Sequence, residues 1–263
     1  MTFFVFFTIT EGGAANSVLR FILPWEYVSA KGTFMIRKLF HGSQNIVETP
    51  LWGYGKRYND YGLGFYCTDS LAMAKEWGVG KGQNGFANCY EINCEGLSIL
   101  DLNSAAFTIL HWLTVLLQNR EFDIPSGLAF EAKAYLLENF SIPYERYDAI
   151  IGYRADDSYF SFAQDFINGT ISYRQLTNAM HLGKLGQQFV LKSPLAFERI
   201  RFLGYEVAES ELWYARKMAR DHAARREYFD VERNRRKRGD IYITHILDEE
   251  MKSDDARLRQ AVS

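Results

Sequence analysis

The sequence predicts a globular fold of mixed α and β class, in a chain long enough to bury a large core. Its 263 residues are 48% hydrophobic and 24% charged, which is ordinary for a globular protein. Segments with strand character alternate with segments of helical character, without repeats or low complexity. Aromatic residues make up 16% of the chain, which favours a strand-rich core.

The strand signals are short apolar or alternating runs that end at glycine or polar residues. In chain order they lie at 39–41, 64–67, 88–93, 97–100, 147–152 and 188–191. The run at 147–152 has a continuous apolar centre, which indicates a short buried strand.

The helical segments begin at residues that cap helix N-termini. A first helix is expected at 69–77, with Thr68 or Asp69 as its cap and Gly78 at its end. Later helices are expected at 105–118, at 128–139, at 173–182 behind a Ser172–Gln175 capping box, and at about 209–237. His111 lies among apolar residues of the second helix, so we expect a structural core histidine.

Charge and cysteine content limit the possible functions. The net charge of −2 provides no overall field for nucleic acid or an anionic membrane. Three cysteines (Cys67, Cys89 and Cys94) form no Cys-x-x-Cys pair and support neither a disulfide framework nor a zinc site. The longest uncharged stretch, 102–119, contains too many polar residues for a spanning helix. We therefore expect a cytoplasmic protein that binds no metal and no membrane.

Two short motifs carry the candidate site. The first, His41-Gly42-Ser43, ends a strand, and the second, at 62–69 (GLGFYCTD), is a glycine-rich loop that leads into a strand and a helix start. Such residues suit a flat ring that carries an amide, because a glycine backbone can pair with the amide while Tyr66 stacks on the ring.

The side chains around Tyr66 should alternate between two faces of the strand. Tyr66 is expected to face the cleft, whereas Phe65 and Cys67 are expected to face the core. Cys67 is therefore expected to be a buried, inert thiol.

Taken together, the motifs resemble those of the His-Tyr-Glu branch of ADP-ribosyltransferases, which includes poly(ADP-ribose) polymerases and diphtheria-type toxins. The stretch 62–69, with Ala72 and Ala74 on the next helix, is similar to the polymerase pattern position by position. The stretches 150–157 (IIGYRADD) and 182–193 (LGKLGQQFVLKS) resemble a bacterial family of unknown function placed in that superfamily. The resemblance covers about residues 35–193.

The resemblance implies an α+β fold with a split antiparallel β-sheet, flanking helices and an NAD cleft between the two halves. It implies transfer of ADP-ribose from NAD, as substrate, to a protein or nucleic acid by a bacterial toxin or defence effector, with a small antitoxin as a possible partner. His41 would hydrogen-bond a ribose hydroxyl, while Gly42, Ser43 and Tyr66 would hold the nicotinamide end.

The family pattern requires a glutamate at the start of a late strand, and here Gln187 and Gln188 occupy that region. Either glutamine could take the position. Glutamine keeps the hydrogen bond but not the charge that stabilises an oxocarbenium-like state, so NAD binding survives this replacement more easily than catalysis does.

A carboxylate could instead come from the loop expected after the strand at 150–151. Asp156 and Asp157 lie there, and Arg154 could clamp a phosphate. The alternative for this loop is a turn held by salt bridges.

The end of the chain differs in charge from the rest. Residues 214–238 hold ten Lys and Arg against four Asp and Glu. A basic helix can bind nucleic acid or an acidic partner, although a solvated helix face is the simpler interpretation. Accordingly, the alternatives to a transferase are an NAD glycohydrolase, a catalytically silent NAD-binding module, or a nucleic-acid-binding protein that acts through this helix.

The expected organisation has three parts. Residues 1–34 form an N-terminal extension, 35–204 the functional domain and 205–263 a C-terminal helical extension. Met35 is an alternative start, because it leads directly into the first strand.

Overall fold

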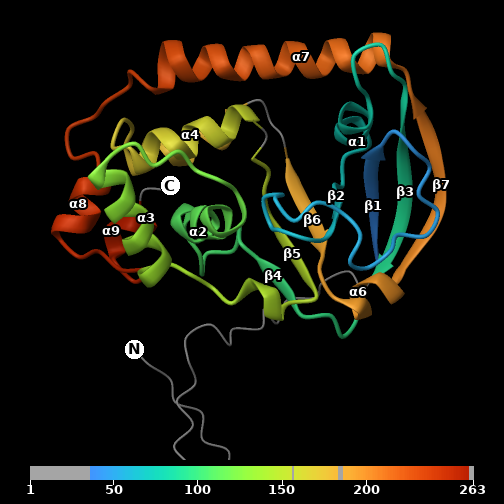
Figure 1. The fold of residues 1–263 in the computed structure, drawn as a ribbon, viewed down its shortest axis with the longest axis horizontal. Helices are drawn as coiled ribbons and strands as arrows, with labels where there is room; N and C mark the ends of the chain where they lie inside the picture. The colour runs from blue at the N-terminus through green and yellow to red at the C-terminus, as the bar shows by residue number, and fades with distance from the viewer. Residues whose placement is uncertain (1–35, 156, 183–185, 261–263) are drawn as a thin grey trace, which may run out of the picture. The chain divides into compact units, whose positions relative to one another are not determined.

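The computed structural model describes residues 36–155, 157–182 and 186–260, all within the unit Thr33–Ser263 (Figure 1). The expected extension at 1–34 lies outside the described residues. The expected boundary between residues 204 and 205 falls inside a strand that runs through it, Ile200–Ala208.

Two sheets form the centre of this unit. A three-stranded antiparallel sheet has the order β1-β3-β7, and a four-stranded sheet has the order β2-β6-β5-β4. Their strands are β1 (Ile36–Ser43), β2 (Phe65–Cys67), β3 (Gly85–Asn93), β4 (Ile99–Asp101), β5 (Ala149–Tyr153), β6 (Gln187–Leu191) and β7 (Ile200–Ala208). The sheets meet at one bridge, where Phe40 and Thr68 exchange backbone hydrogen bonds of 2.8 and 2.9 Å. We call this junction the seam.

The four-stranded sheet is not purely antiparallel, which corrects the expectation for this sheet. β4 and β5 are parallel, whereas the other neighbours are antiparallel. The reason is the connection: the chain leaves β4 through two helices before it enters β5, and such a crossover returns the chain in the same direction. The α+β class itself is confirmed.

Most of the helices lie on one side of the four-stranded sheet, whereas β7 is at an open edge of the fold (Figure 1). α1 (Leu71–Gly78) packs on β1 and β3. The largest hydrophobic core lies on the helical side of the four-stranded sheet. Its helices include α2 (Ile109–Asn119), α3 (Gly127–Asn139), α4 (Asp157–Ile167), α5 (Tyr173–Ala179), α8 (Ile243–Asp248) and α9 (Ala256–Gln260). A second core, which contains Leu39, Cys67 and Phe189, lies between the sheets.

Alternation along β5 explains how one strand serves both cores. Ile150 belongs to the helical core and Ile151 to the core between the sheets, so the strand is buried on both faces. The buried strand expected at 147–152 is confirmed, with bounds Ala149–Tyr153.

The helix ends follow local hydrogen bonding. α1 begins after Ser70, whose Oγ accepts from Met73 N, rather than after Thr68 or Asp69. Thr68 Oγ1 accepts instead from Ser70 N at 3.2 Å, so the expected cap was wrong, although the helix ends at Gly78 as expected.

A histidine stabilises the start of α2, and a glutamine stabilises the start of α5. Thr108 N donates to His111 Nδ1 at 2.9 Å, and burial lowers the pKa of His111 to about 4, so the structural role expected for His111 is confirmed. The Ser172–Gln175 capping box is also confirmed, although α5 ends at Ala179.

The helix expected at about 209–237 is shorter in the structure and packs against other helices. α7 (Ser210–Glu227) contacts α1 and α4, and a π-helical turn at Tyr228–Glu232 follows it (Figure 1). The short elements α6 (Pro194–Glu198) and the 3₁₀ turn η1 (Tyr144–Arg146) complete the fold. Within the described part of the chain, no helix has the length and apolar character that a membrane crossing requires.

Candidate functional site

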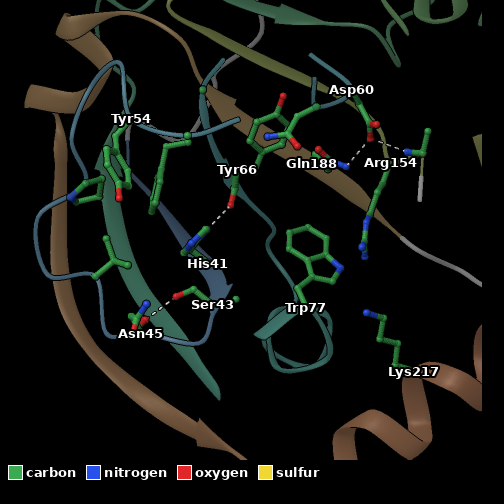
Figure 2. A pocket seen from close by; sticks show the side chains of 18 of the residues that line it. His41, Ser43, Asn45, Tyr54, Asp60, Tyr66, Trp77, Arg154, Gln188 and Lys217 are labelled. Carbon is green, nitrogen blue, oxygen red and sulfur yellow. Dashed lines mark hydrogen bonds between the residues drawn. The ribbon is translucent and has the colours of Figure 1, made fainter. Parts of the chain in front are cut away.

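A cavity of about 900 Å³ lies beside the seam of the two sheets (Figure 2). Its walls come from the end of β1, the loop at 44–64, β2, the C-terminal turn of α1, the segments after α2 and β5, the start of β6 and one face of α7. The sequence-predicted residues in its wall are His41, Gly42, Ser43, Tyr66, Arg154 and Gln188.

His41 is held in one tautomer by the strand next to it. Its Nδ1 lies 2.8 Å from the backbone oxygen of Tyr66, and since a carbonyl only accepts, Nδ1 carries the proton. Burial lowers the pKa of His41, so the ring is neutral and its Nε2 keeps a lone pair. His41 therefore offers an acceptor to a hydroxyl group in the cavity.

Tyr66 is fixed by its hydroxyl group. The hydroxyl donates to Gly62 O at 2.6 Å and accepts from Tyr61 N at 3.1 Å, so the phenol is used within the loop and the ring remains as the cavity wall. Cys67 is fully buried in the core between the sheets, and burial raises the pKa of its thiol. The expected alternation of these two side chains is confirmed, whereas Phe65 both packs on that core and reaches the cavity.

Gly42 is required by packing, independent of any ligand. A Cβ at this position would lie 2.0 Å from Ala74 O and 2.8 Å from Trp77 Cβ. The glycine therefore lets α1 sit directly on β1, which brings the Trp77 ring to the cavity.

Ser43 belongs to a small hydrogen-bonded turn organised by Asn88, which the sequence did not reveal. Ser43 Oγ donates to Asn45 O at 2.5 Å and accepts from Asn88 Nδ2 at 3.0 Å. Asn88 is fully buried, and its Oδ1 accepts from Val47 N at 2.9 Å. The loop after β1 is thereby held against the cavity.

The two glutamines have different surroundings. Gln187 is exposed and does not line the cavity, whereas Gln188 is 4% exposed and does. Gln188 Nε2 donates to Asp60 Oδ2 at 3.1 Å (Figure 2). Gln188 Oε1 is buried and has no hydrogen-bond partner among the described residues.

Asp60 is a cavity residue that sequence reasoning missed. Its Oδ2 also accepts from Ala155 N at 2.8 Å, and its Oδ1 accepts from Arg120 Nη1 at 3.1 Å. Burial raises the pKa of Asp60 to about 6, although these donors and Arg154 oppose the rise. No local pattern marks Asp60, because its partners come from distant parts of the chain.

The segment after β5 is partly a helix start. Arg154 lines the cavity, and its guanidinium lies 4.5 Å from the centre of the Trp77 ring. Asp156 lies outside the described residues. Asp157 is the first residue of α4, so the expected loop is already helical at this position.

One face of α7 closes the cavity from the other side. Lys217 points toward Trp77 (Figure 2). The other lining residues of this helix are Tyr214, Met218, Asp221 and Arg225, whose spacing corresponds to one helical face. The ion pair between Arg220 and Glu76 holds α7 to α1. The basic helix therefore contributes to the cavity, which its position far along the sequence did not suggest.

The comparisons with known proteins give one result. A family model with the description "Protein of unknown function (DUF3990)" matches residues 37–202, a stretch that includes β1, β2 and β6 and ends before α7. The search of curated proteins and the search of solved structures each found no match. Since the matched stretch is more than half of the chain, this protein belongs to the family described as "Protein of unknown function (DUF3990)".

Proposed function

We propose that this protein transfers ADP-ribose from NAD to a macromolecular acceptor, protein or nucleic acid, and that its fold is of the ADP-ribosyltransferase type. The observation that carries the proposal is the shared cavity of His41, Tyr66 and Gln188. These residues come from three strands, and in the sequence they resemble the His-Tyr-Glu pattern with glutamine in place of glutamate.

The nicotinamide end of NAD would lie on the Tyr66 ring, with its amide paired to the Gly42 backbone. A neutral His41 accepts from one ribose hydroxyl through Nε2, and Gln188 Oε1 supplies a second acceptor. A cavity of about 900 Å³ falls within the range of ligand pockets and suits a ligand as large as a dinucleotide.

The diphosphate of NAD requires positive charge in the same cavity. Arg154 on one wall and Lys217 on the facing wall supply it. A diphosphate between them would connect the strand side of the cavity with α7.

The direct test is incubation of the protein with labelled NAD and cell lysate, followed by digestion of the labelled product. Loss of label with nuclease identifies a nucleic-acid acceptor, and loss with protease identifies a protein. If neither label nor free nicotinamide is produced, the transferase proposal fails. A toxin or defence effector is further supported if expression stops growth and a neighbouring small gene, as antitoxin, restores it.

A second candidate is favoured by Gln188, the glutamine that we propose in place of the glutamate of the pattern. An NAD glycohydrolase would release nicotinamide without labelling any acceptor, and a silent module would bind NAD and release nothing. The same incubation separates these outcomes.

The basic residues of segment 214–238 support a third candidate, a nucleic-acid-binding protein. Its exposed cations include Arg226, Arg236, Lys237 and Arg238. Reversal of these four charges should weaken nucleic-acid binding or labelling steeply with salt, because neutralised phosphates release counterions. A salt-independent effect would exclude this role for the segment.

A further inference from the structure

A buried carboxylate, that of Asp60, lies beside Gln188 in the cavity wall. Asp60 is 5% exposed and lines the cavity together with Gln188. Its donors come from three places: Arg120 after α2, Ala155 after β5, and Gln188 at the start of β6. A buried charge is costly, so a carboxylate held at a cavity wall indicates a role at that site.

The charge on Asp60 decides which way the Gln188 amide points. An ionised carboxylate only accepts hydrogen bonds, so Nε2 must face Asp60 and Oε1 must face away from it. Gln188 Oε1 is buried, has no partner among the described residues, and belongs to a side chain in the cavity wall. The pair therefore leaves an acceptor, rather than a donor, unused in a residue of the cavity wall.

We propose that Asp60 is a positioning residue that acts through Gln188, and that the two side chains together replace the glutamate of the His-Tyr-Glu pattern. This inference rests on the proposed function. The amide keeps the hydrogen bond to the ribose, and the carboxylate behind it supplies the negative charge. Because a charge-assisted hydrogen bond from Nε2 polarises the amide, Oε1 becomes a stronger acceptor than that of an isolated glutamine.

The reaction requires the negative charge of Asp60 while the bond between the ribose and nicotinamide breaks. When the bond between ribose C1′ and the nicotinamide nitrogen breaks, its electron pair leaves with nicotinamide, which becomes neutral, and positive charge develops on C1′ and the ring oxygen. The acceptor atom then bonds to C1′, and the proton that it loses passes to solvent. Negative charge near the ribose lowers the energy of the cationic state more than that of bound NAD.

The matched test uses Asp60→Asn, which keeps the size of the side chain and removes its charge. We expect nicotinamide release from NAD to lose about 100-fold in kcat, the usual effect of removing one electrostatic contact to a transition state. The dissociation constant for NAD should stay within a few-fold, because ground-state contacts are kept. The control is Asp165→Asn, a carboxylate that accepts from the Tyr228 hydroxyl at 2.7 Å and does not line the cavity.

The decisive variant exchanges the two groups. Asp60→Asn combined with Gln188→Glu returns one carboxylate to the pair, and it should recover at least part of the lost kcat. A purely structural role of Asp60 predicts no such recovery. If the double variant is folded, binds NAD and is no faster than Asp60→Asn, the proposal is wrong.

Failure of this inference can be distinguished from failure of the proposed function. If the parent protein releases no nicotinamide from NAD, the proposed function fails and the inference with it. If the parent is active and folded Asp60→Asn keeps its full kcat, only the inference fails. Where Asp60→Asn does not fold, Gln188→Met tests the pair from the other side, and full kcat in that folded variant overturns the proposal.

Discussion

His41 donates its Nδ1 proton to the backbone oxygen of Tyr66 at 2.8 Å, across the seam between the two sheets. This one contact fixes the tautomer of the histidine and joins the two motifs that the sequence singles out. It also means that changes at His41 have two consequences, one on the seam and one on the cavity.

Two substitutions separate these consequences. His41→Asn places an amide nitrogen near the position of Nδ1, so it should keep the seam and lose the Nε2 acceptor. His41→Leu should lose both and cost about 1 kcal/mol more in unfolding free energy, the usual value of one hydrogen bond. Chemical denaturation and NAD titration measure the two effects. Undiminished NAD affinity in His41→Asn would remove Nε2 from the site.

Tyr66 should bind NAD through its ring rather than its hydroxyl. NAD should raise the melting temperature of the parent protein by mass action, and Tyr66→Phe should keep that shift. Tyr66→Phe should also lower the melting temperature without ligand, because the hydroxyl contacts Gly62 O and Tyr61 N. Tyr66→Leu should abolish the NAD shift. Equal shifts in the leucine variant and the parent would contradict the stacking role.

Asp60 should give the protein a distinct pH dependence of stability. Burial raises its pKa to about 6 against 3.8 for an ordinary aspartate, so the folded state binds a proton more readily than the unfolded state. Stability should therefore rise as the pH falls from about 6 to about 4, by an amount on the order of 2–3 kcal/mol relative to Asp60→Asn. The charged neighbours that oppose the raised pKa are Arg120 and Arg154.

Comparison of the two proteins at each pH isolates this contribution, because the other titrating groups are common to both. Urea denaturation between pH 4 and 7 is the measurement. If the parent protein loses stability relative to Asp60→Asn as the pH falls, the pKa of Asp60 is lowered in the folded state and the prediction is wrong.

Gly42→Ala should separate the packing of α1 from ligand binding. The added Cβ would lie 2.0 Å from Ala74 O, which cannot move without displacing α1. We expect a loss of about 1–3 kcal/mol in unfolding free energy, as for other overpacked sites. Gly127→Ala is the control, since nothing lies within 4 Å of a Cβ there. Similar stability of both variants would contradict the close packing of α1 on β1.

Lys217 should contribute to NAD binding although it lies outside the stretch matched by the family model. Lys217→Glu reverses a charge in the cavity wall and should raise the KM for NAD about tenfold or more, with little change in melting temperature. Lys237→Glu is the matched control, because Lys237 is exposed and does not line the cavity. Equal effects of the two variants would show a general effect of charge rather than a contact.

The local features of the site were predictable because they depend on near neighbours in sequence. The alternation of Tyr66 and Cys67 follows from strand geometry, and the Ser172–Gln175 capping box follows from a three-residue spacing. The strand β7 is not predicted, because Gly204 interrupts its apolar run and a glycine weakens the interior of a strand. α4 is not predicted, because the charged residues at 154–157 indicate a polar loop at its start.

By itself, the sequence determined the two motifs, the mixed α and β class, and the buried, unpaired state of Cys67. The tertiary structure alone decided that Asp60 lies against Gln188, 128 residues away, and that α7 lines the same cavity. Strand alternation and helix caps depend on residues a few positions apart, so they leave a pattern in the sequence. A contact between a loop and a distant strand depends on how whole elements pack, and no local spacing records it.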